Sequence, residues 1–151
     1  MLHAAHAIRV AVPHFRSAGG GAVVIVASIT GWKPGPRSSY ATAKAAETHL
    51  GAVLAQGLGR YRVRVNPVSP GSTYFPGGGW DRFRERQPGQ YAAFAHDEFP
   101  AGRLLVPDEI ADVICFLLSD RASAVNGAHV PADGGQGRPN ARTFSRQPDQ
   151  G

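Results

Sequence analysis

Apolar residues follow two alternating spacings along the chain. Residues 2–15 place them at intervals of three and four, which predicts an amphipathic helix with one buried face. Residues 22–27 instead form a short, continuous, valine-rich run, which is typical of a strand buried in a parallel sheet. Helix-like and strand-like segments continue to follow one another along the chain. Helices are predicted at 40–58 and 108–119, and strands at 63–68 and 128–132.

The segments between these elements are rich in glycine, proline or polar residues. Residues 28–39 contain two glycines and two prolines and are predicted to form a loop. Residues 77–102 combine glycine with aromatic side chains, and we expect an irregular, mobile segment that faces a substrate. Residues 136–151 have almost no apolar content and are predicted to be a disordered tail. Three repeats of helix followed by strand in residues 1–135 predict an α/β domain with parallel crossovers.

Composition and charge exclude some classes of partner. The chain has 151 residues, of which 42% are hydrophobic, and this indicates one compact domain. Its net charge is +5, but the basic residues are scattered. The densest stretch is Arg60, Arg62 and Arg64, which strand alternation would place on one face. We therefore expect no nucleic-acid partner.

Cysteine, histidine and the lengths of the apolar runs bear on location and metal binding. Cys115 is the one cysteine and lies in the apolar run 113–118, so we expect a buried thiol and a reducing, cytoplasmic location. No apolar run approaches the ~18 residues that cross a bilayer, and no membrane partner is expected. The six histidines show no metal-ligand spacing with carboxylates, which predicts no metal site.

A tyrosine and a lysine at the start of the 40–58 helix are the strongest candidates for chemistry. Tyr40 and Lys44 are four residues apart and therefore project from the same helix face. Ser28 directly follows the first predicted strand, where parallel sheets present loops to ligands. A phenol with an ordinary pKa of about 10 needs a nearby cation to act as an acid and base at neutral pH. The sequence holds no Gly-x-Ser-x-Gly motif, which argues against a serine hydrolase.

These motifs occur in an order that resembles a known family. Residues 22–71, with Ser28, the Tyr-x-x-x-Lys element and the stretch Asn66-Pro67-Val68-Ser69-Pro70-Gly71, resemble the carboxyl-terminal half of a short-chain dehydrogenase/reductase. Residues 107–119 and 126–135 are similar to the last helix and last strand of that family. The resemblance implies a partial Rossmann-like, doubly wound fold that contains the last three parallel strands with flanking helices.

The resemblance also implies roles for individual residues. Tyr40 would be the general acid and base, Lys44 would lower its pKa and hold the nicotinamide ribose, and Ser28 would hydrogen-bond the substrate carbonyl. The cofactor would be NAD or NADP, and the substrate a small-molecule alcohol or ketone. Three further residues match the loop that meets the nicotinamide, namely Pro70, Gly71 and Thr73.

The sequence departs from the family pattern in three places. The loop from Ser28 to Tyr40 is one residue shorter than usual, and the family's helix asparagine would fall at or before Met1. The Gly-rich phosphate loop that follows a first strand is missing, because residues 19–21 precede a strand and residues 135–137 precede the polar tail. We therefore expect a truncated domain, possessing three strands of about six, with weakened cofactor binding.

Two functions remain open from the sequence. The first is an NAD(P)-dependent oxidoreductase that acts on an alcohol or carbonyl compound. The second is a non-catalytic remnant of the family that acts as an interaction module, either as a homo-oligomer or with a partner chain of the same family. In a truncated fold the strand at 22–27 would have a free edge, which favours pairing with another chain. A separate choice concerns five aromatic residues, which either line a substrate pocket or close a small core; they are Trp80, Phe83, Tyr91, Phe94 and Phe99.

Overall fold

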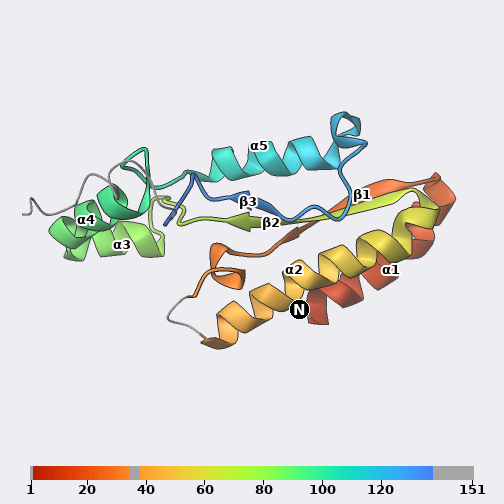
Figure 1. Ribbon diagram of the computed structural model, residues 1–151, viewed down its shortest axis with the longest axis horizontal. Coiled ribbons are helices and arrows are strands. Elements are labelled where there is room, and N and C mark those ends of the chain that lie inside the picture. The colour runs from red at the N-terminus through yellow and green to blue at the C-terminus, as the bar shows by residue number, and fades with distance from the viewer. Residues whose placement is uncertain (1, 35–37, 138–151) are drawn as a thin grey trace, which may run out of the picture.

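A computed structural model describes residues 2–34 and 38–137 of the protein. The three strands form one parallel sheet in the order β1-β2-β3, which confirms the predicted α/β fold of three parallel strands with flanking helices. Helices α1 and α2 lie on one face of the sheet and α5 lies on the other, whereas α3 and α4 lie beyond one end (Figure 1). The bounds are α1 Leu2–Ala18, β1 Gly21–Val26, α2 Ser38–Leu58, β2 Val63–Pro70, α3 Gly79–Arg86, α4 Pro88–Glu98, α5 Pro107–Leu118 and β3 Val130–Ala132.

The central strand β2 explains why two hydrophobic cores form. Val63 and Val65 point to one face and pack with Ile8 of α1 and Leu58 of α2. Val68 points to the opposite face and belongs to the core that α5 covers through Leu117. Besides Arg64, Asn66 and Ser69, β2 carries valine and proline, and nearly all of the strand is buried between the two layers of helices. Each fully buried side chain of this type contributes about 1.5–3 kcal/mol relative to exposure.

Two glycines permit close contacts between the helices and the sheet. A Cβ on Gly51 of α2 would lie 2.8 Å from the Pro67 ring of β2, and a Cβ on Gly21 of β1 would collide with the Phe15 ring of α1. A larger residue at either position would force the helix away from the strand. These two glycines therefore allow α1 and α2 to lie close to the sheet.

The segment 77–102 is ordered and helical, so the prediction of an irregular segment is wrong. It forms α3 and α4, which are separated by Gln87. The two helices enclose a third hydrophobic cluster whose buried members are Ala95, Phe99 and Leu104. The glycines of this segment suggested an irregular structure, but they lie mainly at the ends of the helices, and Pro88 occupies the first turn of α4, where the absence of an N–H has no cost.

The thiol of Cys115 is exposed, and the prediction that it is buried is wrong. Helix α5 buries Ile110 and Leu117. Cys115 lies five residues after Ile110, which places it about 140° around the helix from that residue. An apolar run in an amphipathic helix therefore does not bury all of its members.

Three further predictions concern single residues and the tail. Gln136 is buried, so the packed part of the chain extends past the predicted start of the tail. Residues 138–151 of that tail lie outside the described residues.

The basic stretch at 60–64 does not place its three arginines on one strand face. Strand β2 begins only at Val63, and Arg62 has a left-handed backbone with φ of 59°. Within the described residues, no helix combines the length and the apolar character needed to cross a membrane.

Candidate functional site

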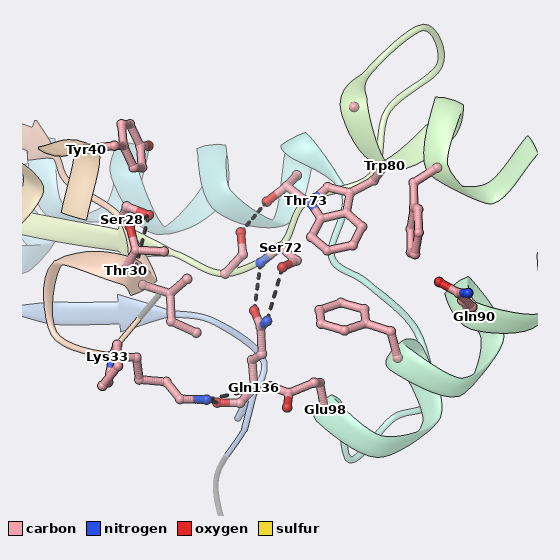
Figure 2. Close-up of a pocket in the computed structure, with 16 residues that line it drawn as sticks. Ser28, Thr30, Lys33, Tyr40, Ser72, Thr73, Trp80, Gln90, Glu98 and Gln136 are labelled. Atoms are coloured by element: carbon pink, nitrogen blue, oxygen red, sulfur yellow. Dashed lines mark hydrogen bonds and ion pairs between the residues drawn. The ribbon is translucent and has the colours of Figure 1, made fainter. Parts of the chain in front are cut away.

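A cavity of about 960 Å³ lies at the carboxyl ends of the strands. Loops that follow β1 and β2 and the first turn of α2 form one side of it, and α3 and α4 form the other (Figure 2). Its volume is near the upper limit of the ~300–1,000 Å³ range that is typical of small-molecule sites. The carboxyl ends of strands in parallel α/β sheets are the usual place for a ligand.

Ser28 and Tyr40 both line this cavity. Ser28 has extended backbone and caps the short turn Ile29–Gly31, since its hydroxyl oxygen accepts a hydrogen bond from the Thr30 N–H at 3.3 Å. The Thr30 hydroxyl lies 3.1 Å from the Ser28 hydroxyl. Tyr40 is 47% exposed, and its hydroxyl has no hydrogen-bond partner among the described residues.

Lys44 stands one helical turn behind Tyr40, with its ammonium 5.8 Å from the centre of the Tyr40 ring. The ammonium donates to the Val26 carbonyl at 2.8 Å and to the Glu47 carboxylate at 2.8 Å. A Cβ on Gly31 would lie 2.9 Å from the Lys44 backbone, so this glycine permits the turn after Ser28 to pack on α2. Lys44 does not itself line the cavity, and its ammonium lies behind the ring of Tyr40, which does.

The loop after β2 brings Gly71 and Thr73, but not Pro70, to the cavity wall. A Cβ on Gly71 would lie 2.8 Å from the Asp133 Cα, so a glycine here permits the turn after β3 to pack closely. The Thr73 hydroxyl donates to the Gly71 carbonyl at 3.0 Å. Thr73 also pairs with Leu105 in an isolated bridge, which fixes the loop against the segment that enters α5.

The sequence reasoning missed a polar network that closes one end of the cavity. The Gln136 side-chain oxygen accepts from the Ser72 N–H at 2.8 Å, and its amide nitrogen donates to the Ser72 hydroxyl at 3.1 Å (Figure 2). The Lys33 ammonium donates to the Gln136 carbonyl at 3.2 Å and forms an ion pair with Glu98 at 3.6 Å. These residues come from four separate segments, and no local sequence pattern relates them.

Aromatic side chains form the wall opposite Ser28. Trp80 and Phe83 come from α3 and Phe94 comes from α4, and all three line the cavity. Trp80 and Phe94 also pack on the Phe99 cluster, so for these two rings the predicted alternatives, pocket wall and small core, both apply. Asp81 anchors α3, because its carboxylate accepts from the Gly77 N–H and the Tyr74 hydroxyl, each at 2.8 Å. The Gly77 N–H and the Tyr74 hydroxyl hold the pKa of Asp81 below its ordinary value.

In the part of the chain that the structure describes, no three histidine, cysteine or carboxylate side chains cluster in a way that could hold a metal ion. The chemistry that the described side chains offer at the cavity is therefore that of hydroxyl groups, amides, aromatic rings and one Lys–Glu pair.

Comparison with protein families identifies a match along most of the chain. The family model described as enoyl-(acyl carrier protein) reductase matches residues 2–136. The chain is 38% identical over 127 residues to 4-formylbenzenesulfonate dehydrogenase of Comamonas testosteroni, a match that covers 83% of this chain and 50% of the relative. It is 34% identical over 125 residues to the 3-oxoacyl-[acyl-carrier-protein] reductase of Thermotoga maritima, covering 82% and 48%. The chain thus spans about half the length of these relatives.

Solved structures agree with this fold. L-sorbose reductase from Gluconobacter frateurii, complexed with NADPH and L-sorbose, matches with a TM-score of 0.77 and 29% identity, covering 89% of this chain and 55% of that chain. A 7α-hydroxysteroid dehydrogenase complexed with NADH and 7-oxo glycochenodeoxycholic acid matches with a TM-score of 0.72 and 29% identity, covering 83% and 48%.

Proposed function

Because this chain belongs to the short-chain dehydrogenase/reductase family, we propose that it transfers hydride between NAD(P) and a small-molecule alcohol or carbonyl compound. The observation that carries the proposal is the convergence of Ser28 and Tyr40 on one cavity, with the Lys44 ammonium one turn behind the tyrosine ring. Ser28 and Tyr40 come from different segments, which the packing of Gly31 on α2 holds together.

The proposed roles follow from the position of each polar atom. The nicotinamide, when bound, supplies or accepts the hydride. The Tyr40 hydroxyl, which has no hydrogen-bond partner among the described residues, donates a proton to the carbonyl oxygen during reduction and removes it during oxidation. The Ser28 hydroxyl, now paired with Thr30, donates a hydrogen bond to the same oxygen. The Lys44 charge favours the negative charge that develops on the Tyr40 oxygen.

The described residues fit one end of a nicotinamide dinucleotide. The cavity is large enough for a small ketone and a flat ring together, and Tyr40, Gly71 and Thr73 line it. These residues would hold the nicotinamide end. The sequence holds no Gly-x-Gly-x-x-Gly stretch that would hold the pyrophosphate end, and the glycines at 77–79 between β2 and α3 do not form one. We therefore expect weak cofactor binding by this chain.

The relatives support the class of substrate. By name, the Comamonas testosteroni relative is a dehydrogenase of 4-formylbenzenesulfonate, and the Gluconobacter frateurii structure contains L-sorbose with NADPH. Both are small molecules that carry a carbonyl group. We extend that class, an alcohol or a carbonyl compound, to this chain.

A single substitution tests the proposal. The 151-residue chain is assayed for NADH- and NADPH-dependent reduction of a panel of aldehydes and ketones, beside a Tyr40→Phe variant. We expect turnover by the chain and at least a hundredfold loss in the variant, because the proton donor is removed. Tyr61→Phe is the matched control, since Tyr61 packs in the α1–α2 core away from the cavity. Absence of turnover across the panel, or equal turnover by Tyr40→Phe, contradicts the proposal.

A second candidate, a non-catalytic interaction module, is favoured by the position of β1. This strand pairs with β2 along one edge, and no described strand pairs with its other edge. An open edge of valine and isoleucine favours association with another chain of the same kind. Calorimetric titration separates the two candidates, because micromolar binding of NADH or NADPH contradicts a purely structural role.

A further inference from the structure

We propose that the cavity selects an uncharged alcohol or ketone whose apolar body is about the size of a six-membered ring or larger. The oxygen of this substrate faces Ser28 and Tyr40, and its apolar body packs against the aromatic rings of α3 and α4. The inference rests on the proposed function and narrows its substrate class.

The cavity has two chemically different walls (Figure 2). The wall at the ends of the strands carries the hydroxyl groups of Ser28, Thr30 and Tyr40. The wall from α3 and α4 carries the rings of Trp80, Phe83 and Phe94. A substrate that satisfies both walls must be polar at one end and apolar at the other. A ketone as small as acetone has no atoms to reach the second wall while its oxygen contacts the first.

The aromatic wall is fixed before a ligand arrives. The Trp80 and Phe94 rings stack with centroids 4.6 Å apart and an interplanar angle of 18°. Phe83 meets Trp80 edge to face at 5.9 Å, and Phe94 meets the buried Phe99 at 6.2 Å. Asp81 further ties α3 to the loop before it. Because these rings are already held in place, they lose little side-chain entropy when a ligand binds. More of the free energy of apolar contact therefore remains as binding affinity.

The charges that line the cavity cancel. Lys33 and Glu98 are the lysine and carboxylate among the described lining residues, and their charged atoms lie 3.6 Å apart. The Lys33 ammonium also donates to the Gln136 carbonyl, so it already has two partners within the cavity wall. A carboxylate or phosphate on the substrate would therefore lose hydration without gaining an unopposed positive charge. This balance favours an uncharged substrate.

The experiment uses the two tryptophans as reporters in the full chain. Indole N–H signals are recorded by NMR on ¹⁵N-labelled protein and assigned with a Trp32→Phe variant, because Trp32 does not line the cavity. Cyclohexanol, 2-propanol and cyclohexanecarboxylate are titrated with and without NADH. We expect the Trp80 signal to shift saturably with cyclohexanol, at least tenfold tighter than with 2-propanol, because three more carbon atoms are buried. The carboxylate should bind at least tenfold more weakly than cyclohexanol.

Variants of α4 test the aromatic wall itself. Phe94→Leu, which preserves an apolar side chain in the cluster, and Phe94→Ala should weaken cyclohexanol binding about threefold and tenfold and leave 2-propanol unchanged. Tyr91→Ala is the matched control, since Tyr91 belongs to the same cluster but does not line the cavity. The proposal is overturned if cyclohexanol and 2-propanol bind equally, if cyclohexanecarboxylate binds more tightly than cyclohexanol, or if Trp80 gives no saturable shift under either condition.

The same measurements separate this inference from the proposed function. Ring-alcohol binding without any hydride transfer contradicts the oxidoreductase activity and leaves the binding preference standing. If the chain turns over cyclohexanone and acetone with equal kcat/KM, the oxidoreductase activity is supported. The proposed preference for a ring-sized substrate is then overturned.

Discussion

The ammonium of Lys44 lies 2.8 Å from a carboxylate oxygen of Glu47, and Glu47 is only 2% exposed. Burial acts to raise the pKa of Glu47, but hydrogen bonds and neighbouring positive charges, those of Lys44 among them, outweigh it, so the pKa lies below its ordinary value of 4.5. The same ammonium donates to the Val26 carbonyl at the end of β1. Glu47 therefore fixes the cation that stands behind Tyr40 in the candidate site.

Glu47→Gln should lower the free energy of unfolding by about 2 kcal/mol at pH 7, because it breaks a largely buried ion pair whose lysine keeps some contact with water. Since the folded pKa is lowered, the stabilisation is fully present above about pH 4.5 and is lost as the pH falls through the folded value. Urea unfolding at pH 7 and pH 3 measures the change. The difference between the two proteins should shrink at the lower pH.

Glu85→Gln is the control for this prediction, since Glu85 is an exposed residue of α3. It should change the free energy of unfolding by less than about 0.5 kcal/mol. If both substitutions lower the free energy of unfolding equally at pH 7, the buried Lys44–Glu47 pair does not stabilise the fold more than an exposed glutamate does.

His129 predicts a pH dependence in a different range. Its Nε2 lies 2.8 Å from the Ser69 hydroxyl, its ring meets Trp32 edge to face, and burial holds its pKa below the ordinary 6.5 despite the charge of Asp133. The unfolded chain therefore binds a proton first as the pH falls, and the free energy of unfolding should decrease below about pH 6.5. Urea unfolding between pH 7.5 and pH 5 measures this slope.

His129→Gln should reduce the slope, because an amide can hold the Ser69 contact without titrating in this range. His96→Gln is the control, since His96 is exposed and lies on α4. If both variants keep the slope of the original protein, a group other than His129 causes it.

The fold near the candidate site could be predicted where a local pattern carried the information. The alanine- and leucine-rich segment 40–58 and the valine-rich run 22–27 predicted α2 and β1 directly. The aromatic wall could also have been found, since Trp80 and Phe83, and Tyr91 and Phe94, are each three residues apart, as on one face of a helix. The flanking glycines and Pro88 concealed this spacing.

Contacts between distant segments could not be predicted from the sequence. Gln136 forms a hydrogen bond with Ser72, which lies 64 residues away in the sequence. Lys33 donates a hydrogen bond to the Gln136 carbonyl, 103 residues away. Nothing near Gln136 in the sequence distinguishes it from the polar residues that follow it. Its burial depends on the tertiary arrangement of the loops, which local propensity does not encode.

Arg64 connects the sheet to the end of α5. Its guanidinium donates to the carbonyls of Leu117 at 2.8 Å, Ser119 at 3.0 Å and Val125 at 3.3 Å. These include carbonyls at the helix terminus that have no partner within the helix. Arg64→Met should lower the free energy of unfolding by about 2–3 kcal/mol, because hydrogen bonds to a charged group are lost. Urea unfolding checks this. The exposed Arg62→Met is the control and should cost less than about 0.5 kcal/mol.

The open edge of β1 predicts association between copies of the chain. Val26 at the end of this strand is 47% exposed, so a charged side chain fits there without disturbing the core. Because a lysine on an edge strand disfavours pairing with another strand, Val26→Lys should shift the chain towards the monomer. Sedimentation velocity over a range of concentrations measures this, with Val10→Lys on the exposed face of α1 as the matched substitution. If the unaltered chain is a monodisperse monomer at high concentration, or if both lysine variants reduce association equally, the β1 edge is not the contact.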